Sequence, residues 1–400
     1  MRRTSLTGIV VSQCAFLALV GCTVNNNTVN PDAGPTGDAG TSDSAVQGDS
    51  GPRTLAFTAS NIDLSGLDLS MVGDIDATMN CSFNSDMKQQ LCGDDAKVVF
   101  KTMTLANGTK VGVYVARSFR VEPNAVVKID GNAPIVFVAL DKIEVLGGIV
   151  GAAKDYGTVA GGFTQETHNT KGGGPGGGLA GTSMNAAGGG SYCGIGGAGA
   201  SESGAPGSAG GPAYGTPELV PLVGGSSGGA GEASAGAGGG AVQLVASNAI
   251  TIAAGGFVHV GGGGGGNGGA AGTQEASGGG SGGAILLEAT TVTVAGILAA
   301  NGGGGGEGAL GNVGADATAT DQPALGGNDP MRGSNGGNGS AGVSAKGTDG
   351  AVKAGSTAGG GGGGAGRIRI NTKSGAATLT GATLSPAAST TCATQGTIHP

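Results

Sequence analysis

The feature that most constrains this chain is a pattern that occurs twice between Ala241 and Gly306. Each copy has three short strand-like pieces followed by a glycine tract. The first copy begins AVQLVA (241–246) and ends in the tract 261–269, and the second begins AILLEA (284–289) and ends in the tract 302–306. Apolar and polar residues alternate over short runs in both copies, which is typical of strands with one buried face. Ala246 and Ala289 take equivalent places in the two copies.

Related strand-like runs precede and follow these copies. They include VYVA (113–116), VFVA (136–139) and RIRINT (367–372), and Ala116 and Ala139 again mark equivalent places. One such unit buries about six aliphatic side chains worth roughly 1.5–3 kcal/mol each, whereas ordering its residues costs about 1.5 kcal/mol apiece. A single unit therefore cannot fold alone, and units must stack. We expect an all-β fold over residues 113–400, a β-solenoid that resembles a right-handed β-helix.

Two glycine-rich insertions interrupt this pattern, at about 152–240 and 307–364. The chain has 92 glycines among 400 residues, no tryptophan and 3% aromatic residues, so only a narrow core can be filled. The insertions have two interpretations. They are disordered or loosely packed loops, because glycine loses the most entropy on ordering, or they are a bundle of extended polyglycine helices related to polyproline II. In the second case bare backbones approach closely and bond to each other.

Residues 1–21 are expected to be a lipoprotein signal peptide, with Arg2 and Arg3 before an apolar run too short to span a bilayer as a mature helix. The run ends in LVGC (19–22), which resembles the lipobox of bacterial lipoproteins. That resemblance implies that Cys22 is acylated and becomes the mature N-terminus, where several acyl chains anchor a protein stably. The alternative is plain secretory cleavage beside an incidental cysteine. Thr23 in place of Asp implies the outer membrane by the rule of enteric lipoproteins.

Residues 22–53 lack apolar periodicity and are rich in turn formers, which predicts a flexible tether. Residues 54–112 are expected to form a small β-rich N-terminal module. Within it, Cys81 and Cys92 bracket a polar segment, and a disulfide between them would contribute roughly 3 kcal/mol. Cys193 and Cys392 are the other mature cysteines, so three pairings are formally possible and the local one is favoured.

The composition argues against several functions. The formal net charge is −8 and the 19 basic residues form no cluster outside the signal segment, so we predict no nucleic-acid binding. The pattern Gly-x-Ser-x-Gly occurs at 224–228 and 279–283, without the strand, helix and acid–histidine partners of a hydrolase. We therefore predict no enzymatic activity, with no catalytic, cofactor-binding or metal-binding residues.

We predict that the charged and titratable residues in the strand-like runs lie on the surface. His259 alternates with Val258 and Val260, which predicts that it points outward as a surface residue. Asp130, Asp141 and Glu144 are expected to solvate the polar face. A cluster of two or three carboxylates with Arg or Lys on one face would instead favour a polysaccharide-active protein.

Three segments carry a resemblance to a known group of proteins: LVGC (19–22), GGAILL (282–287) and GGAGRIRI (363–370). In them the chain resembles the glycine-rich, repeat-bearing surface lipoproteins and adhesin-like proteins of myxobacteria. We expect a non-enzymatic, lipid-anchored cell-envelope protein with a structural or adhesive role, whose partners are the membrane and polysaccharide or other surface proteins. Two alternatives stay open: a β-helix protein that binds or cleaves polysaccharide, and an ice-binding-type polyglycine surface.

Overall fold

The computed structural model describes residues 54–89, 92, 97–105, 107–154, 159–269, 275–308, 311–329, 334–352 and 357–399. The chain divides into two compact units, Met1–Ser50 and Gly51–Pro400, and every described residue belongs to the second unit. The expected signal peptide 1–21, the lipidation site Cys22 and the tether 22–53 lie outside the described residues.

The described residues contain β-strands and no α-helix. In chain order the strands are β1 (Ile75–Ala77), β2 (Cys81–Asn84), β3 (Val99–Thr104), β4 (Lys110–Ala116), β5 (Phe119–Val121), β6 (Val126–Asp130), β7 (Ile135–Ala139), β8 (Lys142–Val145), β9 (Gly148–Val150), β10 (Ala241–Ile252), β11 (Phe257–His259), β12 (Ala284–Val294), β13 (Ile297–Ala299), β14 (Arg367–Thr372), β15 (Thr383–Ser385) and β16 (Ala393–Thr397).

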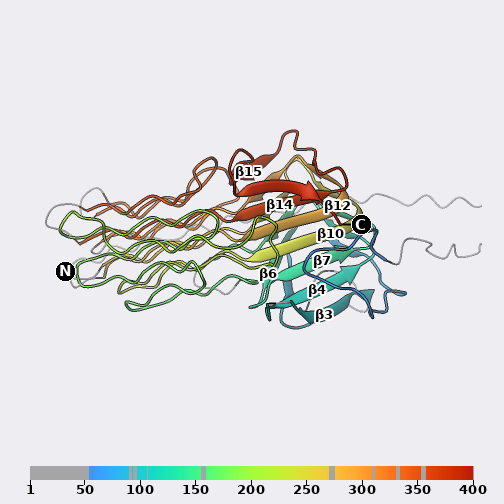
Figure 1. Ribbon diagram of the computed structural model, residues 1–400, viewed down its shortest axis with the longest axis horizontal. Helices are drawn as coiled ribbons and strands as arrows, with labels where there is room; N and C mark the ends of the chain where they lie inside the picture. Colours follow the sequence, from blue (N-terminus) through green and yellow to red (C-terminus); the bar gives the residue numbers. More distant parts are fainter. Residues whose placement is uncertain are drawn as a thin grey trace, which may run out of the picture. The chain divides into compact units, whose positions relative to one another are not determined.

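These strands form two sheets (Figure 1). The ten-stranded sheet has the order β1-β5-β8-β10-β12-β14-β16. A branch of this sheet starts at β10, which also pairs with β7; β7 pairs with β4, and β4 pairs with β3. The six-stranded sheet has the order β15-β13-β11-β9-β6-β2. The pairs are parallel, with β3 and β4 as the antiparallel exception. The four alanines that mark equivalent places align on neighbouring strands: Ala116, Ala139, Ala246 and Ala289.

The expected β-solenoid is wrong. A solenoid needs each unit to pass directly into the next, so that the chain coils around one closed core. Here the chain leaves the sheets between β9 and β10 for residues 151–240, and again between β13 and β14 for residues 300–366. The strands that the pattern identified are therefore shared between two parallel sheets, and no closed coil forms in the described residues.

The two sheets enclose one buried core. Ile143, Ile250 and Val292 of the ten-stranded sheet lie in the same cluster as Val258 and Leu298 of the six-stranded sheet, and all five are at most 2% exposed. Strands with one buried face place every second side chain in such a core. Aromatic rings pack together within this core, where the centroid of the Phe83 ring lies 4.9 Å from those of both Tyr114 and Phe137.

The opposite face of the ten-stranded sheet is covered by two segments, 54–70 and 214–222. Phe57 and Leu69 from the first segment and Leu219 from the second join a buried cluster with Val138 and Leu286 of the sheet. The strands of residues 54–112 belong to the same two sheets as the later strands.

The glycine-rich segments run side by side away from the strand ends (Figure 1). Residues 276–283 lie at the centre and donate their N–H groups in three directions with a period of three residues. The first set of donors, Ala276, Gly279 and Gly282, bonds to the carbonyls of Ala358, Gly361 and Gly364; the second, Ser277, Gly280 and Gly283, to Gly266, Gly263 and Val260; the third, Gly278 and Ser281, to Gly229 and Ser226. Three residues per turn is the repeat of a polyproline II-type helix.

The carbonyls of the same segment accept bonds from three further segments. The donors are Ala187 and Gly190, Gly236 and Gly239, and Gly303 and Gly306. Segment 276–283 therefore has six bonded neighbours, which only residues with very small side chains allow. A Cβ atom on Gly280 would lie 1.9 Å from the carbonyl oxygen of Ala237. Of the two interpretations of the insertions, the described residues follow the hydrogen-bonded bundle rather than loosely packed loops.

Candidate functional site

The outward face of the six-stranded sheet carries one row of aligned side chains. Register places Lys128 beside Val150 and Val150 beside His259, and the row continues to Ser82 on one side and through Ala299 to Ser385 on the other. This row lies where β9 and β11 end and the glycine-rich bundle begins. It is therefore the place where the two parts of the fold meet.

His259 lies on this outward side, as strand alternation predicts, but it is not a surface residue. Only 7% of it is exposed. The chain returns over the end of β11 in a later segment, and the Ala317 N–H donates to the Gly262 carbonyl at 3.0 Å. A Cβ built on Gly261 would lie 2.5 Å from His259 Nε2 and 2.6 Å from the Ala317 Cβ, so the ring is enclosed. The prediction of an exposed histidine was wrong because the covering segment is distant in sequence.

Two hollows open beside this row. The first has a volume of about 460 Å³ and is lined by Lys128, Asp130, Val150, His259, Asp316 and Thr318 among others. The second has a volume of about 280 Å³ and is lined by Gln165, Ala235 and Gly263 among others. The two hollows share Ala153, Lys154 and Asp316, and we call them together the flank groove.

The charges of the flank groove balance, with Lys128 and Lys154 against Asp130 and Asp316. Burial lowers the pKa of His259 to about 4, so the imidazole is neutral at physiological pH. Neither His259 Nε2 nor Gln165 Oε1 has a hydrogen-bond partner among the described residues, although both atoms are buried. Buried polar groups are normally paired, which makes these two atoms exceptional.

Main-chain and side-chain bonds hold the outer wall of the flank groove in place. The Gly264 N–H donates to Asp316 Oδ1 at 2.8 Å. The Asn301 side-chain amide donates to the carbonyls of Thr318 at 3.3 Å and Thr320 at 2.7 Å. Since Ser385 Oγ in turn donates to Asn301 Oδ1, the wall is tied to β15 of the six-stranded sheet. The groove is thus preformed rather than assembled from mobile side chains.

An aromatic ring lies on the same face as the flank groove. Phe257 precedes His259 by two residues on β11, so both side chains take the outward side. The Phe257 ring lies over Gly148 of the neighbouring strand, where a Cβ atom would lie 2.2 Å from the ring. Phe257 is partly exposed and is flanked in register by Ile297.

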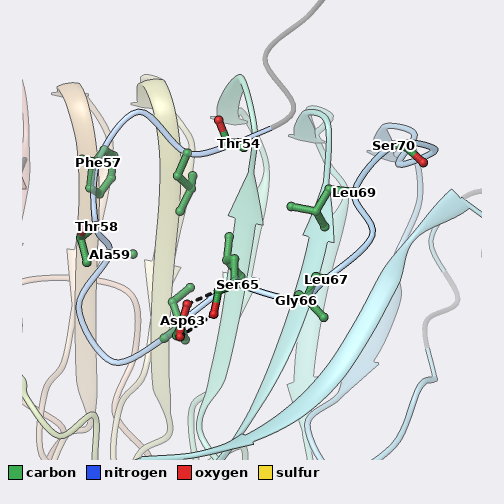
Figure 2. A pocket seen from close by; sticks show the side chains of 13 residues that line it. Thr54, Phe57, Thr58, Ala59, Asp63, Ser65, Gly66, Leu67, Leu69 and Ser70 are labelled. Carbon is green, nitrogen blue, oxygen red and sulfur yellow. Dashed lines mark hydrogen bonds between the residues drawn. The ribbon is translucent and has the colours of Figure 1, made fainter.

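A second candidate site lies on the ten-stranded sheet. Figure 2 shows segment 54–70, which runs out past Phe57 and Ala59 and returns past Asp63 and Leu69. Its two limbs enclose a hollow of about 530 Å³. The larger apolar side chains that line it are Leu55, Phe57, Ile62, Leu64, Leu67 and Leu69.

The polar groups at this second hollow bond to each other. The Ser65 N–H and Oγ each donate to the Asp63 carboxylate at 2.8 Å, and these bonds lower the pKa of that carboxyl (Figure 2). A ligand site normally combines an apolar lining with a few converging polar groups. Since the polar pair here serves a local turn, we assign this hollow to packing of the segment.

The cysteines form two disulfides in the described residues. Cys81 pairs with Cys92, the local pairing that the spacing favours, and Cys193 pairs with Cys392 across 199 residues. The second bond fastens the glycine-rich bundle to the chain just before β16. The prediction for Cys22 lies outside the described residues.

The Gly-x-Ser-x-Gly serines have structural roles. The Ser226 N–H donates to Ser281 Oγ at 2.9 Å, and the Ser281 N–H donates to the Ser226 carbonyl at 3.0 Å. Ser226 Oγ also accepts a bond from the Gly176 N–H at 3.0 Å. Both serines are fully buried, so they join neighbouring segments of the bundle.

The predicted carboxylates are distributed over two faces. Glu144 pairs with Arg120 at 3.1 Å and with Lys142 at 3.0 Å on the ten-stranded sheet, and these partners lower its pKa. Asp141 accepts a bond from Asn248 at 2.7 Å. Asp130 lines the flank groove on the other sheet. No group of three or more His, Cys, Asp or Glu side chains in the described ranges could hold a metal ion.

Sequence reasoning missed most of the flank groove. Lys154, Gln165 and Asp316 lie in or beside the glycine-rich insertions, where no periodicity indicates which residues come together. In the part of the chain that the structure covers, no helix is long and apolar enough to cross a membrane. No protein-family model, curated protein or solved structure matches the chain.

Proposed function

We propose that the chain is a non-enzymatic, lipid-anchored protein of the bacterial cell envelope, held at the outer membrane through Cys22. Its role is structural or adhesive: the glycine-rich bundle presents a rigid surface to polysaccharide or to other surface proteins. The observation that carries this proposal is the set of six bonded neighbours around segment 276–283.

That bond pattern supports rigidity for a physical reason. Glycine loses more conformational freedom on ordering than any other residue, and each main-chain bond returns only about 0.5–1.5 kcal/mol. The ordered glycine-rich bundle costs much conformational entropy, but it forms a rigid module whose interior contains almost no side chains. Its outer positions can then vary without disturbing the packing, which suits an extended surface module.

The outer positions argue against the ice-binding alternative. On one edge segment Asn312, Val313, Ala315 and Thr318 are exposed, whereas Gly314 and Ala317 are buried between them. A regular ladder of Asn or Thr would indicate an ice-binding surface. The described positions mix amide, methyl and hydroxyl groups instead, and we do not propose ice binding.

The first experiment tests the anchor and the adhesion. We expect the full chain produced in a Gram-negative host to incorporate labelled palmitate and to sediment with outer membranes, and the Cys22→Ser variant to do neither. Cells that display the full chain should bind purified extracellular matrix more than cells that display none. Absence of palmitate from the native chain would contradict the anchor, and equal binding by both cell types would contradict the adhesive role.

Polysaccharide cleavage is the second candidate function. Asp130 and Asp316 line one hollow together with Lys128 and Lys154, and a pair of carboxylates is what glycoside hydrolysis uses. The measurement is release of reducing sugar from insoluble polysaccharide into the supernatant. Release that stops in the Asp130→Asn variant would establish this function and overturn the non-enzymatic proposal.

A further inference from the structure

Phe257 and the His259 wall of the flank groove are neighbours on the outward face of the six-stranded sheet. We call the Phe257 ring and the flank groove together the strip. Phe257 and His259 are two residues apart on β11, which places their Cα atoms about 7 Å apart along the strand. Lys128 and Val150 stand in the His259 row, which is the next outward-facing row along the strands from the row of Phe257. A ligand that contacts the ring can therefore extend directly into the groove.

The chemistry of the groove fits an uncharged ligand. Two lysines and two aspartates surround it, so neither an anion nor a cation is favoured by net charge. Burial keeps His259 neutral, and a neutral imidazole has one donor and one acceptor nitrogen, of which Nε2 has no hydrogen-bond partner among the described residues. Side chains of Lys, Asp and Thr add donors and acceptors around the rim. Hydroxyl groups, which both donate and accept, match this mixed set.

The ring supplies the apolar part of the same site. Because Phe257 lies over Gly148, no side chain of β9 stands between the ring and the sheet, and the ring lies close to the backbone. Ile297 extends this apolar surface on one side and Val126 on the other, since all lie in one register row. The apolar faces of sugar rings stack on such aromatic surfaces.

We propose that this strip binds a neutral polysaccharide chain, with one sugar ring stacked on Phe257 and the adjoining sugar in the flank groove between Lys128 and Asp316. The proposal rests on the adhesive function proposed above and names its ligand class and its site. Binding needs no chemical step, and His259 acts as a neutral wall of the groove.

The experiment uses the full chain with Cys22→Ser, which removes the expected acyl attachment and changes no described residue. Crystalline cellulose, chitin and insoluble mannan serve as probes in a co-sedimentation assay. Two variants test the site in different ways. Phe257→Ala removes the ring, and Thr318→Arg places a large side chain at the exposed rim of the groove. Thr291→Arg is the matched control, because Thr291 is also an exposed threonine but lies on the ten-stranded sheet.

We expect the parent chain to sediment with at least one probe and Thr291→Arg to sediment equally. Phe257→Ala should weaken binding by about tenfold, the size expected for loss of one aromatic contact. Thr318→Arg should also weaken binding, because the larger side chain occupies the rim of the groove. Phe257→Tyr, which keeps the ring, should retain binding. Thermal unfolding separates lost binding from lost folding, and Thr318→Arg changes only an exposed position.

Three results would overturn the proposal. Sedimentation of both site variants at the parent level would show that the polysaccharide binds elsewhere, and the adhesive function would stand without this site. Failure of the parent chain to bind any of the probes would contradict neutral polysaccharide as the ligand class. Equal loss of binding in the Thr291→Arg control would show that the effect is not specific to this face.

Discussion

Ser60 and Glu288 are 228 residues apart in the chain, yet Ser60 donates both its N–H and its Oγ–H to the Glu288 carboxylate, at 3.0 and 2.7 Å. Gln243 and Asn371 donate their side-chain amides to the same group, at 2.7 and 3.0 Å. Glu288 is only 1% exposed. A buried carboxylate is costly unless such bonds compensate it, so these four donors hold segment 54–70 across β10, β12 and β14.

The first prediction is that Glu288→Ala destabilises the protein by about 3 kcal/mol or more, because it leaves several buried donors without an acceptor. Ser60→Ala should cost about 1.5–3 kcal/mol, the value of one bond to a charged group. Urea unfolding of the full chain measures both. Thr293→Ala, on the exposed side of the same strand, is the control and should stay within about 0.5 kcal/mol of the parent.

A Glu288→Ala variant as stable as the parent would show that water or another group satisfies the donors. The double variant gives a sharper criterion. If the two residues interact directly, the combined loss must be smaller than the sum of the single losses, since both substitutions remove the bond from Ser60 Oγ to Glu288. Additive losses would contradict the contact.

The second prediction concerns two glycines that are bonded to each other in the bundle. The Gly280 N–H donates to the Gly263 carbonyl at 2.9 Å. A Cβ on Gly280 would lie 1.9 Å from a main-chain oxygen, whereas the nearest atom to a Cβ on Gly263 would be 3.3 Å away. Gly280→Ala should therefore cost about 3 kcal/mol or more, while Gly263→Ala should remain within about 1 kcal/mol of the parent.

Thermal unfolding of the two single variants provides the comparison. Because both substitutions add one methyl group to neighbouring interior positions, composition and propensity are matched. Similar stability of the two variants would mean that the bundle is loose enough to accommodate the added methyl group. This result would contradict the close packing of six neighbours around segment 276–283.

The strands were largely predictable, and the way they assemble was not. Alternation in AVQLVA (241–246) and AILLEA (284–289) identified the long strands β10 and β12, and the alanine equivalence gave their register, Ala246 beside Ala289. The same alternation says nothing about where the chain goes between strands. The chain leaves the sheets over residues 151–240 and 300–366. These segments are the reason why the solenoid predicted from the strand spacing does not form.

The candidate site was less predictable than the strands. Alternation placed His259 on the correct side of β11, but its burial depends on Ala317, which lies in a low-complexity segment. Only the three-dimensional packing of the bundle brings Gln165 and Asp316 beside Lys154. Glycine-rich sequence has no side-chain pattern from which such contacts can be inferred.

The third prediction compares the two disulfides. By the chain-entropy argument, a cross-link stabilises more when it closes a longer loop. Cys193 and Cys392 are separated by 199 residues, and Cys81 and Cys92 by 11. Replacing the first pair by serine should cost about 5 kcal/mol and replacing the second about 3 kcal/mol.

Urea unfolding under non-reducing conditions measures both losses. The parent protein in reductant should lose the stabilisation that both disulfides contribute. A larger loss from the short loop than from the long one would contradict the expected order and indicate that local packing around Cys81 dominates.

The fourth prediction is a pH dependence that His259 produces. Its pKa is about 4 in the folded protein because of burial, against 6.5 in an exposed state. Between these values the unfolded chain binds more protons, so the free energy of unfolding rises with pH. This contribution is present above pH 6.5, is lost as the pH falls towards 4, and amounts to about 3 kcal/mol at most. The His259→Gln variant should lack this rise when unfolding is followed from pH 4 to 7.

The fifth prediction has the opposite sign and concerns Glu275, which is 1% exposed. Burial, reinforced by the charge of Glu202, raises its pKa from 4.5 to about 7, although the Ala358 N–H donates to it at 2.7 Å. Between pH 4.5 and 7 the folded protein binds more protons, so this group's contribution is complete below pH 4.5 and is lost as the pH rises through 7.

Glu275→Gln should therefore remove a decline in unfolding free energy between pH 4.5 and 7, and its stability relative to the parent should increase across that range. The exposed Glu218→Gln serves as the control and should follow the parent. In the parent the His259 and Glu275 contributions oppose each other between pH 4.5 and 6.5, so its profile should be flatter there than that of either variant. Parallel profiles for the parent and Glu275→Gln would show that this carboxyl is ionised in the folded bundle.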